Sequence, residues 1–146
     1  MGFGNILSST NISASGLSSE RLRMEVAANN LANANTTSTK DGGPYRRQVV
    51  RFGSVMTETL GGRTNADGLG GVEVLGVEAD TSDLVEVYQP GHPDAKANGF
   101  VTMPNVAIPE EMVDLMSASR AYEANLKSMT TFRKMAEQAL GLMSPR

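Results

Sequence analysis

Apolar side chains recur at a spacing of seven residues near both ends of the chain, and this repeat limits the folds that the chain can adopt. The C-terminal segment has one row made of Leu115, Tyr122, Met129, Ala136 and Met143, and a second row made of Met112, Leu126 and Leu140; Phe132 lies one place off the second row. A heptad spacing of this kind places a stripe of apolar residues along an α-helix. Pro109, followed by Glu110 and Glu111, predicts where this helix begins.

The first 34 residues carry the same spacing less regularly. One row comprises Phe3, Thr10, Leu17, Met24 and Leu31, and the other comprises Leu7, Ala14, Arg21 and Ala28. The pattern predicts a second long helix with a break near Gly16, because glycine weakens a helix interior. The first charged residue is Glu20, so the outer face before it consists of Ser, Asn and Thr. A solvated helix face normally carries charge, and a neutral face of small side chains instead favours close contacts with several helices.

The N-terminal helix is expected to end in an asparagine-rich run that contains Asn29, Asn30, Asn33 and Asn35 and leads into Thr and Ser. Asn disfavours helix interiors because its side chain competes for main-chain hydrogen bonds. We interpret the run as a loss of helix propensity that is offset when the amides bond to neighbouring helices and end this helix at a defined residue. On this hypothesis Asn30→Ala or Asn33→Ala would raise the helicity of an isolated peptide but weaken assembly.

Between the helices the pattern changes to that of β-structure. Alternating and β-branched residues predict short strands within residues 42–54 and 70–91. Residues 60–71, with the sequence LGGRTNADGLGG, are expected to form a flexible hairpin tip or linker. Residues 88–106 are expected to be an irregular loop, because Pro90, Pro93, Pro104 and Pro109 interrupt a regular strand or helix.

The predicted fold is mainly α with a small β insertion. We expect an N-terminal helix and its end in residues 1–39, a β-rich insertion and Pro/Gly loop in residues 40–104, and a C-terminal helix in residues 105–146. The long terminal helices would pair as an antiparallel coiled coil, so that residues 1–39 and 105–146 form one discontinuous helical domain. Two helices that each bury a single stripe are marginally stable alone, and the pattern therefore favours packing against other chains.

The composition argues against catalysis and metal binding. The chain of 146 residues contains no Cys and a single His, His92, so it has no second imidazole or thiolate to complete a site. His92 is interpreted as a turn residue within a Pro/Gly loop, and neither a cofactor nor an enzymatic activity is expected. No apolar run is long enough to span a bilayer, and the N-terminal segment lacks the basic region of a cleaved signal peptide.

A small basic cluster, Arg46, Arg47 and Arg51, precedes and enters the first predicted strand. It could meet an acidic neighbour or nucleic acid, or it could form a solvated strand face. The net charge of −3 favours the solvated face or a protein partner, and we expect no nucleic-acid partner.

Three long motifs, in order along the chain, resemble one known family. They are ANNLANANTTST followed by GGPYRRQ, then YQPGHPDAKANGFVTMPNV, and then EEMVDLMSASRAYEANL. The chain resembles the flagellar basal-body rod proteins, and its middle loop resembles the members found in the proximal rod. The match covers both termini and the middle loop, and it is weakest in residues 54–72. TSTKDGGPYRR replaces the Pro-Gly-Tyr version of sister rod and hook proteins and agrees with the proximal-rod type.

The resemblance implies a structural role without catalysis. Family members build the axial drive shaft of the bacterial flagellum within the cell envelope, in the periplasm. They pass unfolded through the flagellar type III export channel without a cleaved signal, and their terminal helices then stack into a helical, tubular assembly. The implied partners are copies of the same chain, other rod proteins, and the adaptor and export-gate proteins at the base. Ring proteins around the rod are further candidates.

The candidate assembly interface is the set of terminal residues that the heptad rows and the asparagine run single out. It comprises Leu7, Leu17, Met24, Asn29, Asn30, Leu31, Asn33, Met112, Leu115, Tyr122, Leu126, Met129, Phe132 and Leu140. The alternative function is a coiled-coil adaptor of an export apparatus that never polymerises. That adaptor would be a well-folded monomer or dimer with ordered termini in dilute solution.

Overall fold

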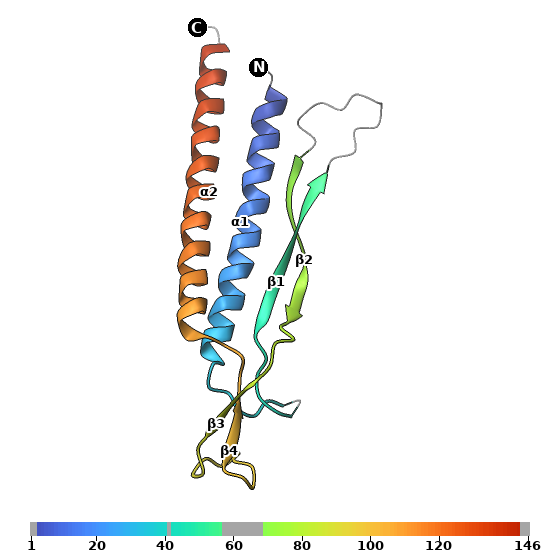
Figure 1. Ribbon diagram of the computed structural model, residues 1–146. Coiled ribbons are helices and arrows are strands. Elements are labelled where there is room, and N and C mark those ends of the chain that lie inside the picture. The colour runs from blue at the N-terminus through green and yellow to red at the C-terminus, as the bar shows by residue number, and fades with distance from the viewer. Residues whose placement is uncertain (1–2, 41, 57–68, 144–146) are drawn as a thin grey trace. The chain divides into compact units, whose positions relative to one another are not determined.

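The computed structural model describes residues 3–40, 42–56 and 69–143, and within them the side chains of residues 9–40, 42–55 and 70–141. The elements follow one another as α1 (Phe3–Ala32), β1 (Gln48–Met56), β2 (Leu69–Ala79), β3 (Val85–Tyr88), β4 (Phe100–Met103) and α2 (Ile108–Met143), as Figure 1 shows. Two long terminal helices therefore flank a small β region, which confirms the mainly α fold predicted from the sequence.

The chain divides into two compact units, and each helix contributes to both. The first unit comprises Met1–Leu22, Phe52–Leu75 and Ala118–Arg146, and the second comprises Arg23–Arg51 and Gly76–Ser117. Buried apolar side chains are few and small in the described residues. They are Val26, Ala27, Ala34 and Val101 in the second unit and Ala118 in the first. A core of this size supplies little burial energy.

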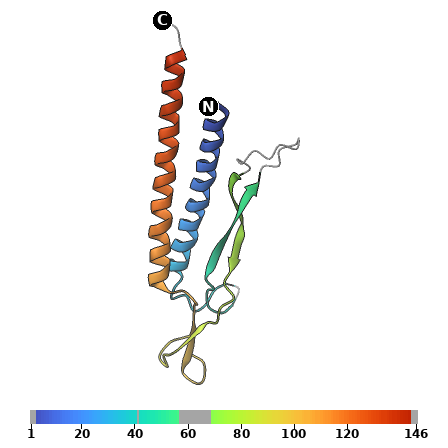
Figure 2. The same ribbon diagram turned by 45° about the horizontal axis from the view of Figure 1, so that its top comes forward.

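In the second unit the last turns of α1 lie beside the first turns of α2, in opposite chain directions (Figures 1 and 2). Arg23 of α1 donates to Asp114 of α2 at 2.7 Å, and Asn30, two turns further along α1, donates to Glu111 at 3.0 Å. Val26 and Ala27 are the buried residues of α1 between these two contacts. Small and β-branched side chains at these positions allow the helices to approach closely.

The β region consists of two separate two-stranded sheets. β1 pairs with β2, and β3 pairs antiparallel with β4 in the register Val85↔Met103 to Tyr88↔Phe100. The strand β4 corrects the expectation that residues 88–106 form an irregular loop. Pro93 and Pro104 lie outside the strand, and the Pro-free residues 100–103 between them are able to pair with β3.

In the first unit α1 runs through Gly16 without the predicted break. A Cβ at Gly16 would lie 2.9 Å from Nδ2 of Asn125 on α2, so the glycine makes room for the second helix. β2 also approaches α1, because Ser15 Oγ accepts a hydrogen bond of 3.1 Å from the Val72 N–H. Gly71 beside it has a φ of 114°, which a residue with a side chain rarely adopts. Both glycines therefore serve close approach between elements.

The helix ends follow from their local sequence. α1 ends at Ala32, and the Asn33 side chain donates at 2.9 Å to the Asn29 carbonyl, one of the carbonyls that a helix end leaves unpaired. α2 begins at Ile108, so Pro109 is its second residue, and Glu110 and Glu111 lie in its first turn as predicted. Of the predicted hairpin tip, residues 60–68 lie outside the described residues and 69–71 belong to β2.

Candidate assembly interface

The part of α2 in the second unit has one side toward its own chain and an apolar side toward solvent. Glu111 is 1% exposed and contacts α1, whereas Met112, the next residue, is 50% exposed. Ile108, Val113 and Met116 are exposed as well. A surface rich in exposed apolar side chains on a helix is typical of a contact with another protein.

The part of α2 in the first unit repeats this arrangement. Ala118 is fully buried, and Asn125 faces Gly16 of α1, whereas Leu126 and Leu140 are 46% and 57% exposed. Tyr122, Met129 and Phe132 are half-buried, as is Leu115 in the second unit. Glu111 and Asn125 approach α1, Ala118 is buried, and these three residues of α2 are themselves seven residues apart. Glu111 and Asn125 each precede a member of the second predicted row, Met112 and Leu126, by one residue, so a heptad repeat marks two neighbouring faces of α2.

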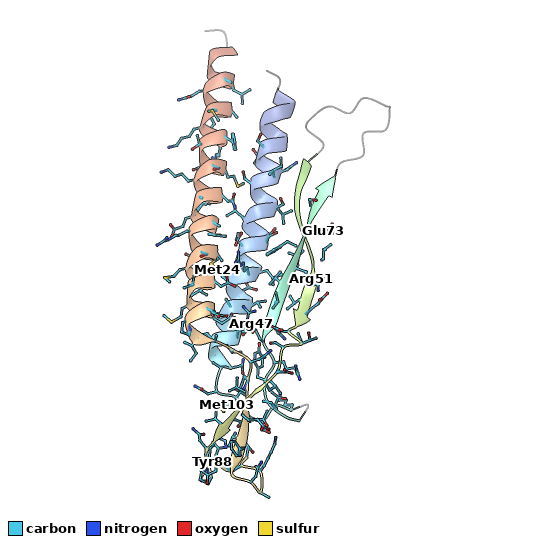
Figure 3. The ribbon with its side chains drawn as sticks, in the orientation of Figure 1. Met24, Arg47, Arg51, Glu73, Tyr88 and Met103 are labelled. Carbon is cyan, nitrogen blue, oxygen red and sulfur yellow. The ribbon has the colours of Figure 1, made fainter. Side chains whose placement is uncertain are left out.

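The α1 candidates are more enclosed. Leu17, Met24 and Leu31 are half-buried, and Asn29 is exposed. Leu7 belongs to α1, but its side chain lies outside the part of the chain whose side chains the structure describes. Figure 3 shows Met24 on α1.

Asn30 lies at the centre of a buried polar cluster, and its amide forms every hydrogen bond that it can form. Its Nδ2 donates to the Gln48 carbonyl at 2.8 Å and to Glu111 Oε2 at 3.0 Å. Its Oδ1 accepts from the Gln48 N–H and from the Tyr45 hydroxyl, both at 2.9 Å. The amide thus pairs with the first residue of β1 as a neighbouring strand would. Asn30 is 1% exposed, so its amide bonds lie within the chain, and one of them reaches Glu111 of the neighbouring helix α2.

Glu111 joins Asn30 to a second set of charged groups. Its Oε1 accepts from Arg47 Nε at 2.5 Å, and Arg47 also lies 3.6 Å from Asp80. The hydrogen bond to Glu111 raises the pKa of Arg47 although burial opposes it. Burial, and then the negative charge of Glu111, raises the pKa of Tyr45. Hydrogen bonds from Ser82, more than Arg47, lower the pKa of Asp80.

The residues just before β1 are held from both sides. The Arg47 N–H donates to Asn105 Oδ1 at 2.8 Å, and the Arg47 carbonyl accepts from the Asp80 N–H at 2.7 Å. Asn105 in turn donates to Ser82 Oγ at 2.8 Å. This cluster therefore connects the end of α1, the start of β1, the turn after β2 and the start of α2.

Sequence reasoning assigned Glu111 only to the helix start and did not single out Tyr45 or Asn105. The one available signal is the spacing of Glu111, Ala118 and Asn125, which are seven residues apart beside the apolar row. A buried carboxylate cannot be recognised from that spacing alone, because charged residues usually mark a solvated face.

The basic cluster finds its acidic partners within the chain. Arg47 contacts Glu111 and Asp80, and Arg51 forms a 2.8 Å ion pair with Glu78. Figure 3 shows both arginines at the β1 strand. Arg46 reaches the carbonyls of the turn after β2 at 3.4 Å. The solvated-face interpretation thus holds for Arg51, which is exposed, and not for Arg47.

His92 is a turn residue, as predicted. Its Nδ1 accepts a 3.1 Å hydrogen bond from the Asp94 N–H, and its own N–H donates to the Gln89 carbonyl at 3.1 Å. Among the described residues, no three His, Asp or Glu side chains are grouped so that they could hold a metal ion. Within the same residues, neither helix has a stretch apolar enough to cross a membrane.

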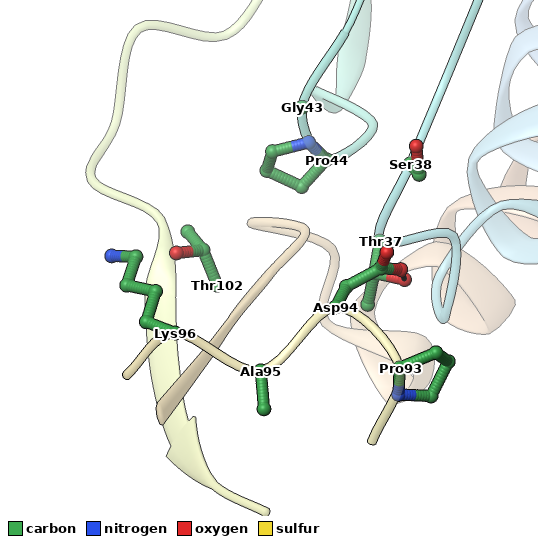
Figure 4. A pocket seen from close by; sticks show the side chains of 9 residues that line it. All are labelled: Thr37, Ser38, Gly43, Pro44, Pro93, Asp94, Ala95, Lys96 and Thr102. Atoms are coloured by element: carbon green, nitrogen blue, oxygen red, sulfur yellow. Dashed lines mark hydrogen bonds between the residues drawn. The ribbon is translucent and has the colours of Figure 1, made fainter. Parts of the chain in front are cut away.

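A shallow polar hollow of about 400 Å³ lies where the chain after α1 meets the loop before β4 (Figure 4). Thr37 donates to Asp94 across it at 2.7 Å. Lys96, Thr102 and Pro44 also line it. Lys96 forms an ion pair with Glu86, so the charges at this hollow are balanced locally.

Known proteins match this chain over nearly its whole length. Residues 11–38 match the family described as flagella basal body rod protein, and residues 97–142 match the C-terminal family of the flagellar basal body rod FlgEFG proteins. The flagellar basal-body rod protein FlgC of Borreliella burgdorferi is 43% identical, over 94% of this chain and 97% of that protein. The FlgC proteins of Bacillus subtilis and Salmonella typhimurium are 42% and 40% identical, over 90% and 94% of this chain and 94% and 97% of their own lengths.

These relatives are described as rod proteins, and they do not favour the alternative of a non-polymerising adaptor. The match joins both terminal helices and the β region between them in a single alignment. The chain belongs to the FlgC family of flagellar basal-body rod proteins and is a structural subunit of the rod in the flagellar basal body.

Proposed function

We propose that this rod subunit enters the proximal rod and assembles there through the apolar side chains that α2 exposes. We call Met112, Leu115, Tyr122, Leu126, Met129 and Leu140 the α2 row. The observation that carries the proposal is the division of α2 into two faces in each unit. Glu111 and Ala118 are buried within the chain, while Met112, Leu126 and Leu140 stay about half exposed.

The exposed area is large enough to support assembly. Complete burial of a Leu or Met side chain stabilises by about 1.5–3 kcal/mol, so burial of the exposed half of each contributes about 1 kcal/mol. Met112, Leu126 and Leu140 together would then contribute about 3 kcal/mol per subunit before entropy losses. Repeated along a polymer, a contribution of this size favours assembly.

The terminal helices are proposed to act together. Residues 1–39 and 105–146 would form one antiparallel coiled coil whose outer faces contact neighbours in a helical tube. Heterologous contacts that do not close into a ring generate such a helical assembly. Leu17, Met24 and Leu31 would support the α1 side, with exposed Asn29 as a polar contact. Asn30 and Asn33 are proposed to act within the chain, where their amides are already bonded.

The partners follow from this placement. Copies of the same chain and other rod proteins would surround the α2 row, with adaptor and export-gate proteins at the base and ring proteins outside. The subunit would act in the periplasm after export through the flagellar channel, without a cleaved signal peptide. It would need neither catalysis nor a cofactor, because an axial shaft transmits torque through packing alone.

The test replaces Met112 with glutamate in cells whose own copy of the gene is deleted. Met112→Glu should leave the far-ultraviolet circular dichroism of the purified chain unchanged and abolish swimming and the recovery of the subunit in basal bodies. Ser117→Glu, an exposed position elsewhere on α2, is the matched control and should preserve both. Normal assembly of the Met112→Glu variant would refute the proposed role of the α2 row.

A second measurement separates the proposal from the adaptor alternative. Hydrogen exchange on the dilute full-length chain should be faster across residues 3–34 and 110–143 than in the β region, and the helices should become protected on assembly. Strong protection of both helices in a monomer that never polymerises would instead support the adaptor.

A further inference from the structure

The strand β3 has an outer edge that no described residue covers. The Gln89 N–H donates to the Gly99 carbonyl, so the bonded pairs with β4 are Val87↔Val101 and Val85↔Met103. In an antiparallel pair the alternate residues direct their main-chain groups away from the partner strand. The N–H and carbonyl groups of Glu86 and Tyr88 therefore point outward.

The outer edge of β4 differs from that of β3. Phe100, which lies opposite Tyr88, has its carbonyl bonded to the Lys96 N–H at 2.9 Å and its N–H bonded to Asn98 Oδ1 at 3.2 Å. Val101 is 1% exposed, and the other β4 residues are half-buried. The sheet thus has one covered edge and one open edge.

The side chains of the open edge are mostly apolar. Val85 is 54%, Val87 36% and Tyr88 63% exposed, and the one charged residue of β3, Glu86, forms an ion pair with Lys96. Figure 3 shows Tyr88 and Met103 in the part of the chain that holds β3 and β4, at opposite ends of the paired strands. Natural proteins usually protect an open edge with unpaired charges or proline, and β3 itself contains neither.

Local charge indicates what kind of strand fits this edge. Asp83 lies exposed just before β3 and forms no ion pair within the described residues, although Arg46 reaches the carbonyl of neighbouring Ser82, whereas Glu86 within β3 is paired with Lys96. A β3 strand of a second copy would bring a further Asp83 and Glu86 to an edge that already carries both, and gathering like charges in this way disfavours the strand pair. The basic extended segment of this chain, Arg47 to Arg51, is also occupied, because both arginines are paired and β1 is bound to β2.

We propose that the outer edge of β3 binds an extended, Lys- or Arg-bearing segment of a different rod protein, which adds to the sheet as a third strand. The added strand would bond to the outward main-chain groups of Glu86 and Tyr88 and cover Val85 and Val87, while its cation would face Asp83. Main-chain bonds supply affinity in strand addition, and the alternating side chains supply specificity. The inference rests on the chain being a rod subunit and does not use the α2 row.

The test variant removes one outward N–H of β3, and a matched control variant keeps it. Glu86→Pro deletes the donor that faces the added strand, and proline is tolerated where a strand N–H faces away from its partner. Glu86→Gln keeps this N–H and removes the same charge. We expect Glu86→Pro to reduce the recovery of the subunit in purified basal bodies by about tenfold, and Glu86→Gln by less than about twofold. Equal recovery of the two variants would overturn the proposal.

A photo-crosslinking amino acid at position 88 identifies the occupant in assembled basal bodies without depending on the folding of the proline variant. The expected product joins position 88 to an extended segment of a different rod protein, and position 81, which is exposed away from the edge, serves as the control. Crosslinks only to another copy of this chain, or none, would refute the proposal. The Met112→Glu experiment tests the α2 row, and the position-88 experiment tests the outer edge of β3, so the two can fail independently.

Discussion

Asn30→Ala should destabilise the subunit far more than the same change at its neighbour Asn29. Both residues lie in the last turns of α1, and both changes gain about 0.6 kcal/mol of helix propensity. They differ in what the side chain bonds. Asn30 forms four hydrogen bonds and is buried, whereas Asn29 is exposed and contributes only its carbonyl to the bonds at the helix end.

The magnitude follows from those four bonds. Three of them join neutral groups, on Gln48 and Tyr45, and contribute about 1 kcal/mol each. The bond to the Glu111 carboxylate contributes about 1.5–3 kcal/mol. Removal of the amide leaves buried groups unpaired, and water can replace some of the bonds. After the gain in propensity we expect Asn30→Ala to lower the free energy of unfolding by about 3–4 kcal/mol.

The assay is urea unfolding of the full-length chain, followed by circular dichroism at 222 nm. With an m-value of about 1.5–2 kcal/mol per molar, the Asn30→Ala midpoint should fall by about 2 M, while the Asn29→Ala midpoint should stay constant or rise slightly. Free energies of unfolding for the two variants that agree within about 1 kcal/mol would refute the central role given to Asn30.

Other variants test the neighbouring contacts. Glu111→Gln should lower the free energy of unfolding by about 2–4 kcal/mol in urea titrations, since Arg47 loses its buried counter-charge; an unchanged value would contradict the assigned ion pair. Tyr45 has a raised pKa, so its contribution to stability is complete below about pH 10 and is lost as the pH rises through the higher pKa of the folded state. The Tyr45→Phe variant should therefore lose less stability than the parent protein between about pH 9 and 11. If the free energy of unfolding falls equally with pH in the two proteins, titration of Tyr45 is not the cause. Gly71→Ala should lower the thermal unfolding midpoint because a positive φ and the Ser15 hydroxyl leave no room for a Cβ, and differential scanning calorimetry would detect a loss of about 1–3 kcal/mol.

The dependence of stability on pH in the acidic range has a different origin. The pKa of Asp80 is lowered in the folded protein. The contribution of Asp80 to stability is therefore present above its pKa in the unfolded chain, about 4, and is lost as the pH falls through its pKa in the folded state. Its bonds to Ser82 lie at an exposed turn, so this part of the cluster should weaken only under strongly acidic conditions.

The sequence by itself determined the two long helices, most of the strands and the family. Heptad spacing extends over many turns and is independent of what the helix contacts, so it predicts an element even when the partner is unknown. The strand β4 was not predicted because it has only four residues, Phe100–Met103, between the preceding turn and Pro104. Its pairing with β3 also depends on a contact between residues that are distant in the sequence.

Tertiary structure alone decided which face of α2 turns inward and what the asparagines do. A seven-residue repeat marks both the exposed Met112 and the buried Glu111 beside it, and only the position of α1 distinguishes the two faces. Likewise, Gly16 predicts a helix break from local sequence, whereas in the structure its missing side chain leaves the space that Asn125 of α2 occupies. Asn30 costs helix propensity locally, and the main chain of Gln48, 18 residues away, compensates for that cost. Periodicity is a local property, whereas the pairing of a buried polar group depends on residues that only the fold brings together.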